Sequence, residues 1–141
     1  MNDAEKHLKI RQSVHKNQDR IDQNHFPGLS VIEINPTELC NRVCSFCPRS
    51  DPEVYPNLNL NMSLETAQTL LSQLLDYNYQ GSIVFSGFGE PTLNPKILDL
   101  LKMFSKHFDV GMVTNGDRFT KGYYSVDQLS ECNLYSLIID A

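Results

Sequence analysis

Residues 29–47 read LSVIEINPTELCNRVCSFC, and this stretch bears on both the fold and the candidate chemistry. Its first part, residues 29–35, is a β-branched apolar run of strand length, which Pro36 ends. A loop rich in Cys, Pro and Asn follows over residues 37–61. The stretch therefore predicts a β-strand followed directly by a loop with three cysteines. Arg49 and residues 50–61 are expected to form a solvated loop, and contact with a substrate is the alternative.

Beyond this loop, helical and extended patterns alternate. Ser63 is suited to cap a helix, and the apolar residues after it recur at helical spacing. They are Leu64, Ala67, Leu70, Leu71, Leu74 and Leu75. Gly81 is placed where the chain is expected to leave this helix. Residues 82–86 then predict a second strand, and residues 87–91 a glycine-rich turn.

The same alternation repeats in the last third of the chain. Asn94 and Pro95 predict the start of a second helix, with Asn94 as its cap. Its expected apolar face consists of Ile97, Leu98, Leu101 and Phe104. Residues 109–114 predict a third strand, residues 125–131 a short helix, and residues 135–139 a fourth strand.

Alternating strands and helices are typical of parallel βα units with right-handed crossovers, which indicates an α/β fold. The chain stops just after the fourth predicted strand, and this would leave a parallel sheet with an open edge. We therefore expect residues 29–141 to be the incomplete first part of a partial parallel (βα)n barrel, truncated after about the fourth strand. Residues 1–28 are expected to form a polar N-terminal arm or helix.

Charge and hydropathy exclude several classes of protein. The formal net charge of −5 argues against a nucleic-acid partner, because proteins that bind phosphate backbones usually present a basic face. No apolar run approaches the length of a membrane span, and the first residues lack the apolar core of a secretory signal. We expect a cytoplasmic protein without a membrane partner, whose four cysteines serve as metal ligands or buried thiols.

Cys40, Cys44 and Cys47 lie within eight residues of one another. Three thiolates on a four-iron cluster leave one iron open, whereas clusters that only carry electrons usually have all four irons bound by cysteine. A structural zinc site with a fourth ligand is the alternative. Cys132 is the remaining thiol, and we expect it to be buried and structural because it precedes the fourth strand, at the other end of the sheet.

The spacing C-x3-C-x2-C after a first strand, with the aromatic Phe46 before the third cysteine, resembles the signature of the radical S-adenosylmethionine superfamily. The resemblance implies a 4Fe-4S cluster on Cys40, Cys44 and Cys47. It also implies that S-adenosylmethionine binds the open iron and is cleaved reductively to a deoxyadenosyl radical, which abstracts hydrogen from a substrate. Phe46 would pack near the adenine. An external one-electron reductant of the flavodoxin or ferredoxin type is implied as a partner.

Two further turns agree with this resemblance. Gly87, Gly89, Glu90 and Pro91 are similar to the family's Gly-Gly-Glu-Pro turn, with Phe88 in place of its first glycine. The resemblance implies that this turn contacts the methionyl amino group. The Thr114-Asn115-Gly116 turn is similar to a family turn that lines the cofactor pocket. All three motifs follow consecutive strands, so they are expected on one rim of the sheet, where α/β barrels build their active sites.

The resemblance covers residues 29–141, the first half of the family's six-stranded partial barrel. The motifs Asn35-Pro36-Thr37 and Cys47-Pro48-Arg49 are similar to members with a SPASM or twitch extension, which modify peptides, proteins or sugars. A peptide or a sugar is therefore the substrate class implied, and no catalytic side chain is identified. The alternatives are a non-catalytic iron–sulfur or zinc protein and an inactive, truncated fragment.

Overall fold

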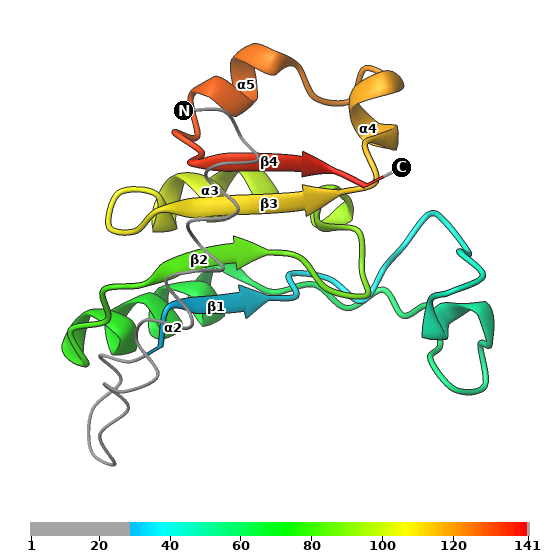
Figure 1. The fold of residues 1–141 in the computed structure, drawn as a ribbon, viewed down its shortest axis with the longest axis horizontal. Coiled ribbons are helices and arrows are strands. Elements are labelled where there is room, and N and C mark those ends of the chain that lie inside the picture. The colour runs from blue at the N-terminus through cyan, green and yellow to red at the C-terminus, as the bar shows by residue number, and fades with distance from the viewer. Residues whose placement is uncertain (1–28, 141) are drawn as a thin grey trace.

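The computed structural model describes residues 29–140, which contain one four-stranded parallel sheet with strand order β1-β2-β3-β4 (Figure 1). The strands are β1 (Val31–Ile34), β2 (Ser82–Phe85), β3 (Val110–Thr114) and β4 (Ser136–Ile139). All four strands point the same way in Figure 1, and the loop after β1 extends beyond their carboxyl ends. The predicted α/β fold, a partial parallel barrel, is confirmed.

The register of the sheet places the ends of the strands at a common edge. Ile34 pairs with Phe85 at the end of β1 and β2, and Thr114 pairs with Ile139 at the end of β3 and β4. Because the strands are parallel, the turns after them meet at this edge. We call this edge of the sheet the carboxyl rim.

Helices connect the strands and cover the sheet. They are α2 (Leu64–Asp76), α3 (Ile97–Phe104), α4 (Asp117–Thr120) and α5 (Val126–Ser130), with short 3-10 helices η2 (Pro48–Ser50) and η3 (Pro91–Leu93). Ser63 caps α2 as predicted, because its side chain accepts a hydrogen bond from the Thr66 N–H. Ser125 caps α5 in a capping box with Gln128.

The core lies between the sheet and the α2–α3 pair. Phe85 of β2 and Phe104 of α3 are fully buried, and their rings meet edge-on with centroids 5.6 Å apart. Leu71 of α2 and Leu101 of α3 belong to the same buried cluster. Burial of these apolar side chains is the main force that stabilises the sheet and fixes its rim.

The start of α3 differs from the sequence prediction. The pattern predicts Asn94 as the cap of this helix, but the helix begins at Ile97 and Lys96 is its N-cap. The predicted cap position is therefore two residues too early. Asn94 Oδ1 nevertheless accepts from the Lys96 N–H at 2.8 Å, in the turn that leads into the helix. The Asn94 side chain is fully buried, and its Nδ2 donates to the carbonyls of Pro36 and Met62, at 2.7 and 3.1 Å. Asn94 thereby ties α3 to both ends of the loop that carries the cysteines.

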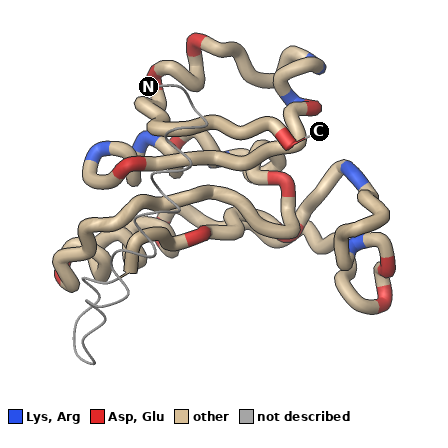
Figure 2. Tube along the Cα trace, viewed as in Figure 1, with Lys and Arg blue, Asp and Glu red and all other residues tan. Residues whose placement is uncertain are grey.

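Charged residues are spread over the helices and loops (Figure 2). Within the four strands, Glu33 is the single charged residue. Cys132 is fully buried, as predicted, and its Sγ donates to the Gln128 carbonyl at 3.3 Å. Within residues 29–140 no helix has the length and apolar character needed to cross a membrane. The predicted N-terminal arm, residues 1–28, lies outside the described residues.

Candidate functional site

The cysteine loop (residues 37–61) brings its three thiols to the carboxyl rim. Cys40, Cys44 and Cys47 are all free thiols and half-buried. The Cys47 N–H donates to the Cys44 carbonyl at 3.0 Å, and the Asn57 side chain binds the Cys40 N–H and carbonyl at 2.9 and 3.0 Å. Contacts within the loop therefore hold the backbone of Cys40 and Cys47.

The three thiols line one cavity of about 230 Å³ together with the turns after β2, β3 and β4. Its other lining residues are Arg42, Phe46, Ser86, Gly87, Phe88, Gly89, Glu90, Pro91, Val113, Thr114, Asn115 and Asp140. The structure thus brings together every residue that the sequence analysis assigned to the site. Asp140 and Ser86 are additional lining residues that no motif indicates.

The donor set consists of three soft thiolates, which are the ligands that iron–sulfur clusters use, and each thiolate needs to reach only one corner of a cluster. Zinc also binds thiolates, but three of them leave it in need of a fourth ligand. In the part of the chain that the structure describes, no group of three or more His, Cys, Asp or Glu side chains converges on one point.

Phe46 is strongly exposed, with 85% of its surface accessible, and it lines the cavity beside the cysteines. An aromatic side chain that is exposed at the wall of a cavity has lost the usual packing of its ring and offers a flat apolar face to a ligand. Its expected contact with an adenine ring stays a prediction.

The glycines of the β2 turn (residues 87–91) are required by contacts within the chain. Gly87 has φ = +126°, and a Cβ there would lie 2.6 Å from the Asn35 side-chain oxygen. A Cβ on Gly89 would lie 1.7 Å from the Thr37 carbonyl oxygen. The turn thus packs directly against the start of the cysteine loop, and the Glu90 N–H donates to the Leu39 carbonyl at 2.7 Å. These glycines therefore let the β2 turn approach Asn35 and Thr37 of the protein itself.

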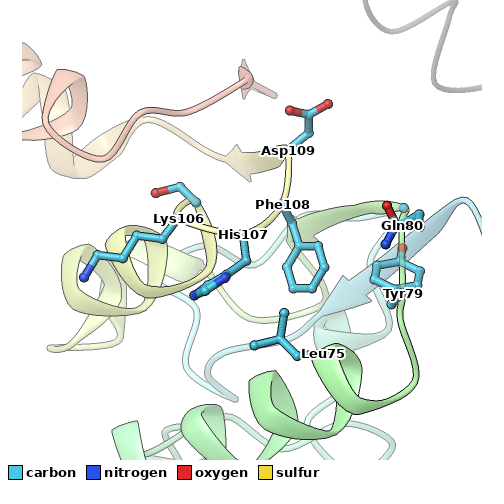
Figure 3. Close-up of a pocket in the computed structure, with 9 residues that line it drawn as sticks. Leu75, Tyr79, Gln80, Lys106, His107, Phe108 and Asp109 are labelled. Atoms are coloured by element: carbon cyan, nitrogen blue, oxygen red, sulfur yellow. The ribbon is translucent and has the colours of Figure 1, made fainter.

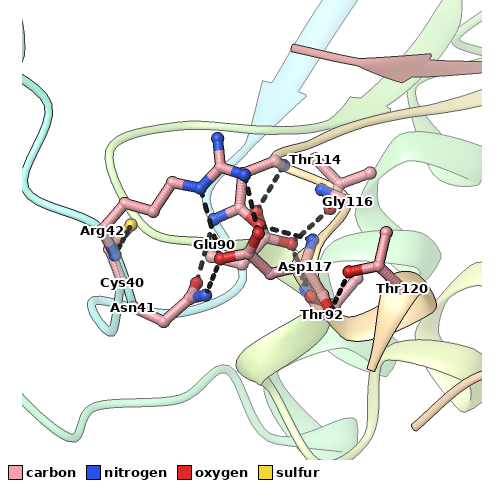
Figure 4. A network of polar contacts seen from close by, with 10 residues as sticks. Cys40, Asn41, Arg42, Glu90, Thr92, Thr114, Gly116, Asp117 and Thr120 are labelled. Atoms are coloured by element: carbon pink, nitrogen blue, oxygen red, sulfur yellow. Dashed lines mark hydrogen bonds and ion pairs between the residues drawn. The ribbon is translucent and has the colours of Figure 1, made fainter. Parts of the chain in front are cut away.

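Glu90 is buried, and its carboxylate joins two turns of the rim (Figure 4). Oε1 accepts from the Thr92 N–H at 3.0 Å and from the hydroxyls of Thr92 and Thr114 at 2.6 Å each. Oε2 accepts from the Asn115 N–H at 2.8 Å. The β2 turn and the β3 turn (residues 114–117) are therefore held together by one carboxylate, whose Oε2 retains capacity for a further donor.

Arg49 supports the cysteine loop from below the surface, and the expectation that it is solvated is wrong. It is 5% exposed, and Nε donates to the Phe88 carbonyl at 2.5 Å. The guanidinium also donates to the Glu38 carbonyl and, at 3.1 Å, to Asn57 Oδ1. It stacks over the Tyr55 ring, 4.7 Å from the centroid. Arg49 thereby fastens the cysteine loop to the β2 turn.

A second contact that the sequence analysis missed joins the other side of the loop to the β3 turn. Arg42 Nη2 lies 2.6 Å from Asp117 Oδ1, and Asn41 Nδ2 lies 2.6 Å from Asp117 Oδ2 (Figure 4). The hydrogen bond between Arg42 and Asp117 lowers the pKa of this carboxyl and raises the pKa of the guanidinium. The only hint of this role in the sequence is the placement of Asp117 one residue after the Thr114-Asn115-Gly116 turn.

A larger cavity, of about 460 Å³, lies at the opposite edge of the sheet, before β2 and β3 (Figure 3). It is lined by Leu75, Tyr79, Gln80, Gly81, Ser105, Lys106, His107, Phe108 and Asp109. None of the residues assigned to the site by the motifs reaches it. Its volume is therefore a weaker indication of function than the smaller cavity with three thiols.

The chain matches the family that the cysteine motif resembles, and it is similar in sequence to several known enzymes. Residues 34–141 match the radical SAM superfamily. An S-adenosyl-L-methionine-dependent 2-deoxy-scyllo-inosamine dehydrogenase from Niallia circulans is 27% identical over 78% of this chain and 44% of that protein. An S-adenosylmethionine-dependent nucleotide dehydratase from Flammeovirga pacifica is 36% identical over 74% of this chain and 36% of its own length. A GTP 3′,8-cyclase from Mesorhizobium japonicum is 25% identical over 75% of this chain and 32% of that enzyme.

Two solved structures have a fold similar to that of this chain. A crystal structure of BtrN in complex with AdoMet and 2-DOIA has a TM-score of 0.66 and 25% identity, over 79% of this chain and 45% of that chain. BtrN in an open conformation has a TM-score of 0.63 and 26% identity, over 79% of this chain and 49% of that chain. The chain thus spans less than half the length of these relatives.

Proposed function

Because the chain belongs to the radical SAM superfamily, we propose that its three loop cysteines bind a 4Fe-4S cluster and that S-adenosylmethionine binds beside it. The observation that carries this proposal is the single cavity shared by Cys40, Cys44 and Cys47 and by the turns after β2 and β3. Three thiolates bind three irons and leave the fourth iron for the cofactor.

The chain's own residues supply the pocket for the cofactor. Phe46 offers its exposed ring to the adenine. Glu90 Oε2 accepts one hydrogen bond and has room for a second, which suits a methionyl ammonium group. Thr114 and Asn115 hold Glu90 in place and line the same wall.

Gly87, Gly89 and Pro91 shape the remaining wall of the pocket, since each of them lines the cavity. The two glycines keep the β2 turn close to the base of the cysteine loop. The distance between the thiols and the β2 turn is thereby fixed before any ligand binds, which reduces the ordering needed on binding.

When bound, the cluster and S-adenosylmethionine together supply a one-electron reductive cleavage that yields the radical for hydrogen abstraction. The protein orients the two groups, and an external one-electron reductant of the flavodoxin or ferredoxin type delivers the electron. The half-buried thiols at an open rim leave such a reductant a short path to the cluster.

A small-molecule substrate is supported by the names of three relatives, which act on an inosamine or on a nucleotide. BtrN, which has a similar fold, was crystallised with AdoMet and 2-DOIA. A peptide or a sugar, as in members with a SPASM or twitch extension, is the second candidate. The motifs Asn35-Pro36-Thr37 and Cys47-Pro48-Arg49 favour it.

The test compares Cys44→Ala with Cys132→Ala after anaerobic reconstitution with iron and sulfide. Cys132 is buried away from the cavity, so the second variant is a matched control for the loss of one thiol. We expect four irons per chain and reductive release of 5′-deoxyadenosine and methionine in the control, and neither in Cys44→Ala. One zinc per chain would support the zinc alternative, and a cluster without cleavage of S-adenosylmethionine the non-catalytic one.

A further inference from the structure

Asp117 is the first residue of α4 and reaches across the carboxyl rim to the cysteine loop (Figure 4). Its Oδ1 accepts from Arg42 Nη2 at 2.6 Å, and its Oδ2 accepts from Arg42 Nε at 3.2 Å. A two-point contact between guanidinium and carboxylate fixes direction as well as distance. The side chains of Arg42 and Asp117 are 31% and 22% exposed, so water screens this pair only in part.

Asn41 adds a second connection from the same carboxylate to the loop. Its Nδ2 donates to Asp117 Oδ2 at 2.6 Å, and its Oδ1 accepts from Asn115 Nδ2 at 2.9 Å. Asn115 in turn accepts from the Asp117 N–H at 3.0 Å. Two consecutive residues of the cysteine loop are therefore bound by two residues of the β3 turn, in a closed set of hydrogen bonds.

The loop residues that Asp117 holds lie directly after Cys40. The Arg42 N–H donates to Cys40 Sγ at 3.5 Å. The position of Arg42 therefore determines whether this N–H reaches the sulfur. Hydrogen bonds to sulfur and nearby charges tune iron–sulfur clusters, and partners outside the ligand set orient the ligands themselves. Asp117 acts on Cys40 through Arg42 and Asn41 and does not touch the sulfur.

We propose that Asp117 is a positioning residue of the cofactor site, which holds Asn41 and Arg42 so that Cys40 keeps one place at the rim. This inference rests on the proposed function, since it assigns Asp117 a role in binding of the cluster. The ion pair links the part of the loop that binds iron to the turn that lines the cofactor pocket. A shift of the cysteine loop therefore moves the β3 turn, and a shift of the β3 turn moves the cysteine loop.

The test uses Asp117→Asn, which keeps the shape of the side chain and removes its charge. Glu131→Gln is the matched control, because Glu131 pairs with Lys102 at 2.8 Å far from the cysteine loop. Each reconstituted chain is challenged with an iron chelator while loss of the cluster is followed by absorbance. We expect Asp117→Asn to lose the cluster about tenfold faster than the control, in line with the size typical for loss of such an outer partner.

Rescue separates positioning from general loss of structure. The double variant Arg42→Asp with Asp117→Arg restores the ion pair in reverse and should recover most of the lost affinity, together with the paramagnetic resonance spectrum of the reduced cluster. If the original chain binds a four-iron cluster and Asp117→Asn retains it as well as Glu131→Gln does, the role of Asp117 is wrong and the proposed function stands. If the original chain binds no such cluster, both are overturned.

Discussion

Two arginines of the cysteine loop fasten it in different ways. Arg49 follows the last cysteine, is 5% exposed, and donates to backbone carbonyls and to Asn57, with the Glu38 carboxylate at 3.4 Å. Arg42 lies between the first two cysteines, has a side chain that is 31% exposed, and binds the carboxylate of Asp117. The loop is thus held by a buried side chain after its last cysteine and by a partly exposed ion pair after its first.

The two arginines therefore have different roles: one stabilises the fold, and the other orients part of the loop. A buried guanidinium that satisfies partly buried carbonyls cannot be removed without leaving those groups without their donor, so it stabilises the fold. A partly exposed ion pair contributes little to stability, because water solvates both groups when it opens. We infer that Arg49 determines whether the cysteine loop forms, and that Arg42 determines where its first cysteine points.

The largest effect is expected from Arg49→Ala. Carbonyls of Phe88 and Glu38 would lose their donor inside the protein, which should lower the free energy of unfolding by about 3 kcal/mol. Chemical denaturation of the apo-protein measures this value. Arg49→Lys keeps the charge but not the planar fork, and should lose a smaller part of the stability. An unchanged unfolding midpoint in Arg49→Ala would remove the basis of the comparison.

Glu90→Gln should have an intermediate effect. Oε1 accepts from the Thr92 N–H and Oε2 from the Asn115 N–H, so an amide nitrogen on either side leaves one backbone donor unpaired. We expect a loss of about 1–3 kcal/mol in the free energy of unfolding. Glu53→Gln, at an exposed loop position, is the control and should be neutral. Equal midpoints in the two variants would show that Glu90 does not join the turns as described.

Arg42→Ala should change the thermal midpoint of the apo-protein only slightly, because its ion pair is partly exposed. Lys102→Ala, which breaks another surface ion pair, is the control and should have the same midpoint. Hydrogen exchange should nevertheless become faster at residues 40–44 in Arg42→Ala alone, because this part of the loop has lost its contact with Asp117. A midpoint that falls as far as in Arg49→Ala would show that the two arginines stabilise the fold alike.

The smallest expected effect is a difference between the four thiols in their rate of alkylation. Burial raises the pKa of the Cys132 thiol, whereas the three loop thiols are half-buried at the rim. Since the thiolate is the reactive form, a limiting amount of alkylating reagent at mildly alkaline pH should modify Cys40, Cys44 and Cys47 before Cys132. Peptide mass spectrometry gives the order, and early labelling of Cys132 would contradict the buried position.

The sheet and the cysteine cavity are predictable from sequence because each depends on local signals. Short apolar runs such as residues 82–86 predict buried strands, and parallel order brings the turns after them to one rim. The spacing of Cys40, Cys44 and Cys47 then indicates the site. The ends of the elements are less accurate, since the pattern predicts Asn94 as the cap of α3, whereas the helix begins at Ile97 with Lys96 as its N-cap.

The contacts that fasten the loop cannot be predicted from sequence, because their partners are far apart in the chain. Arg49 donates to Phe88, 39 residues away, and Arg42 to Asp117, 75 residues away. A charged residue in a polar loop gives no local sign of burial. Glycines are equally ambiguous, since the close approach of Gly89 to the Thr37 carbonyl is visible only in the folded chain.

The central claim is that three cysteines bind a four-iron cluster whose open iron takes S-adenosylmethionine. The most direct measurement is the electron paramagnetic resonance spectrum of the reconstituted, reduced chain with and without S-adenosylmethionine. We expect a four-iron signal that shifts when the cofactor is added, because an open iron then gains a ligand. A signal that ignores the cofactor, or a chain that takes up zinc and no cluster, would contradict it.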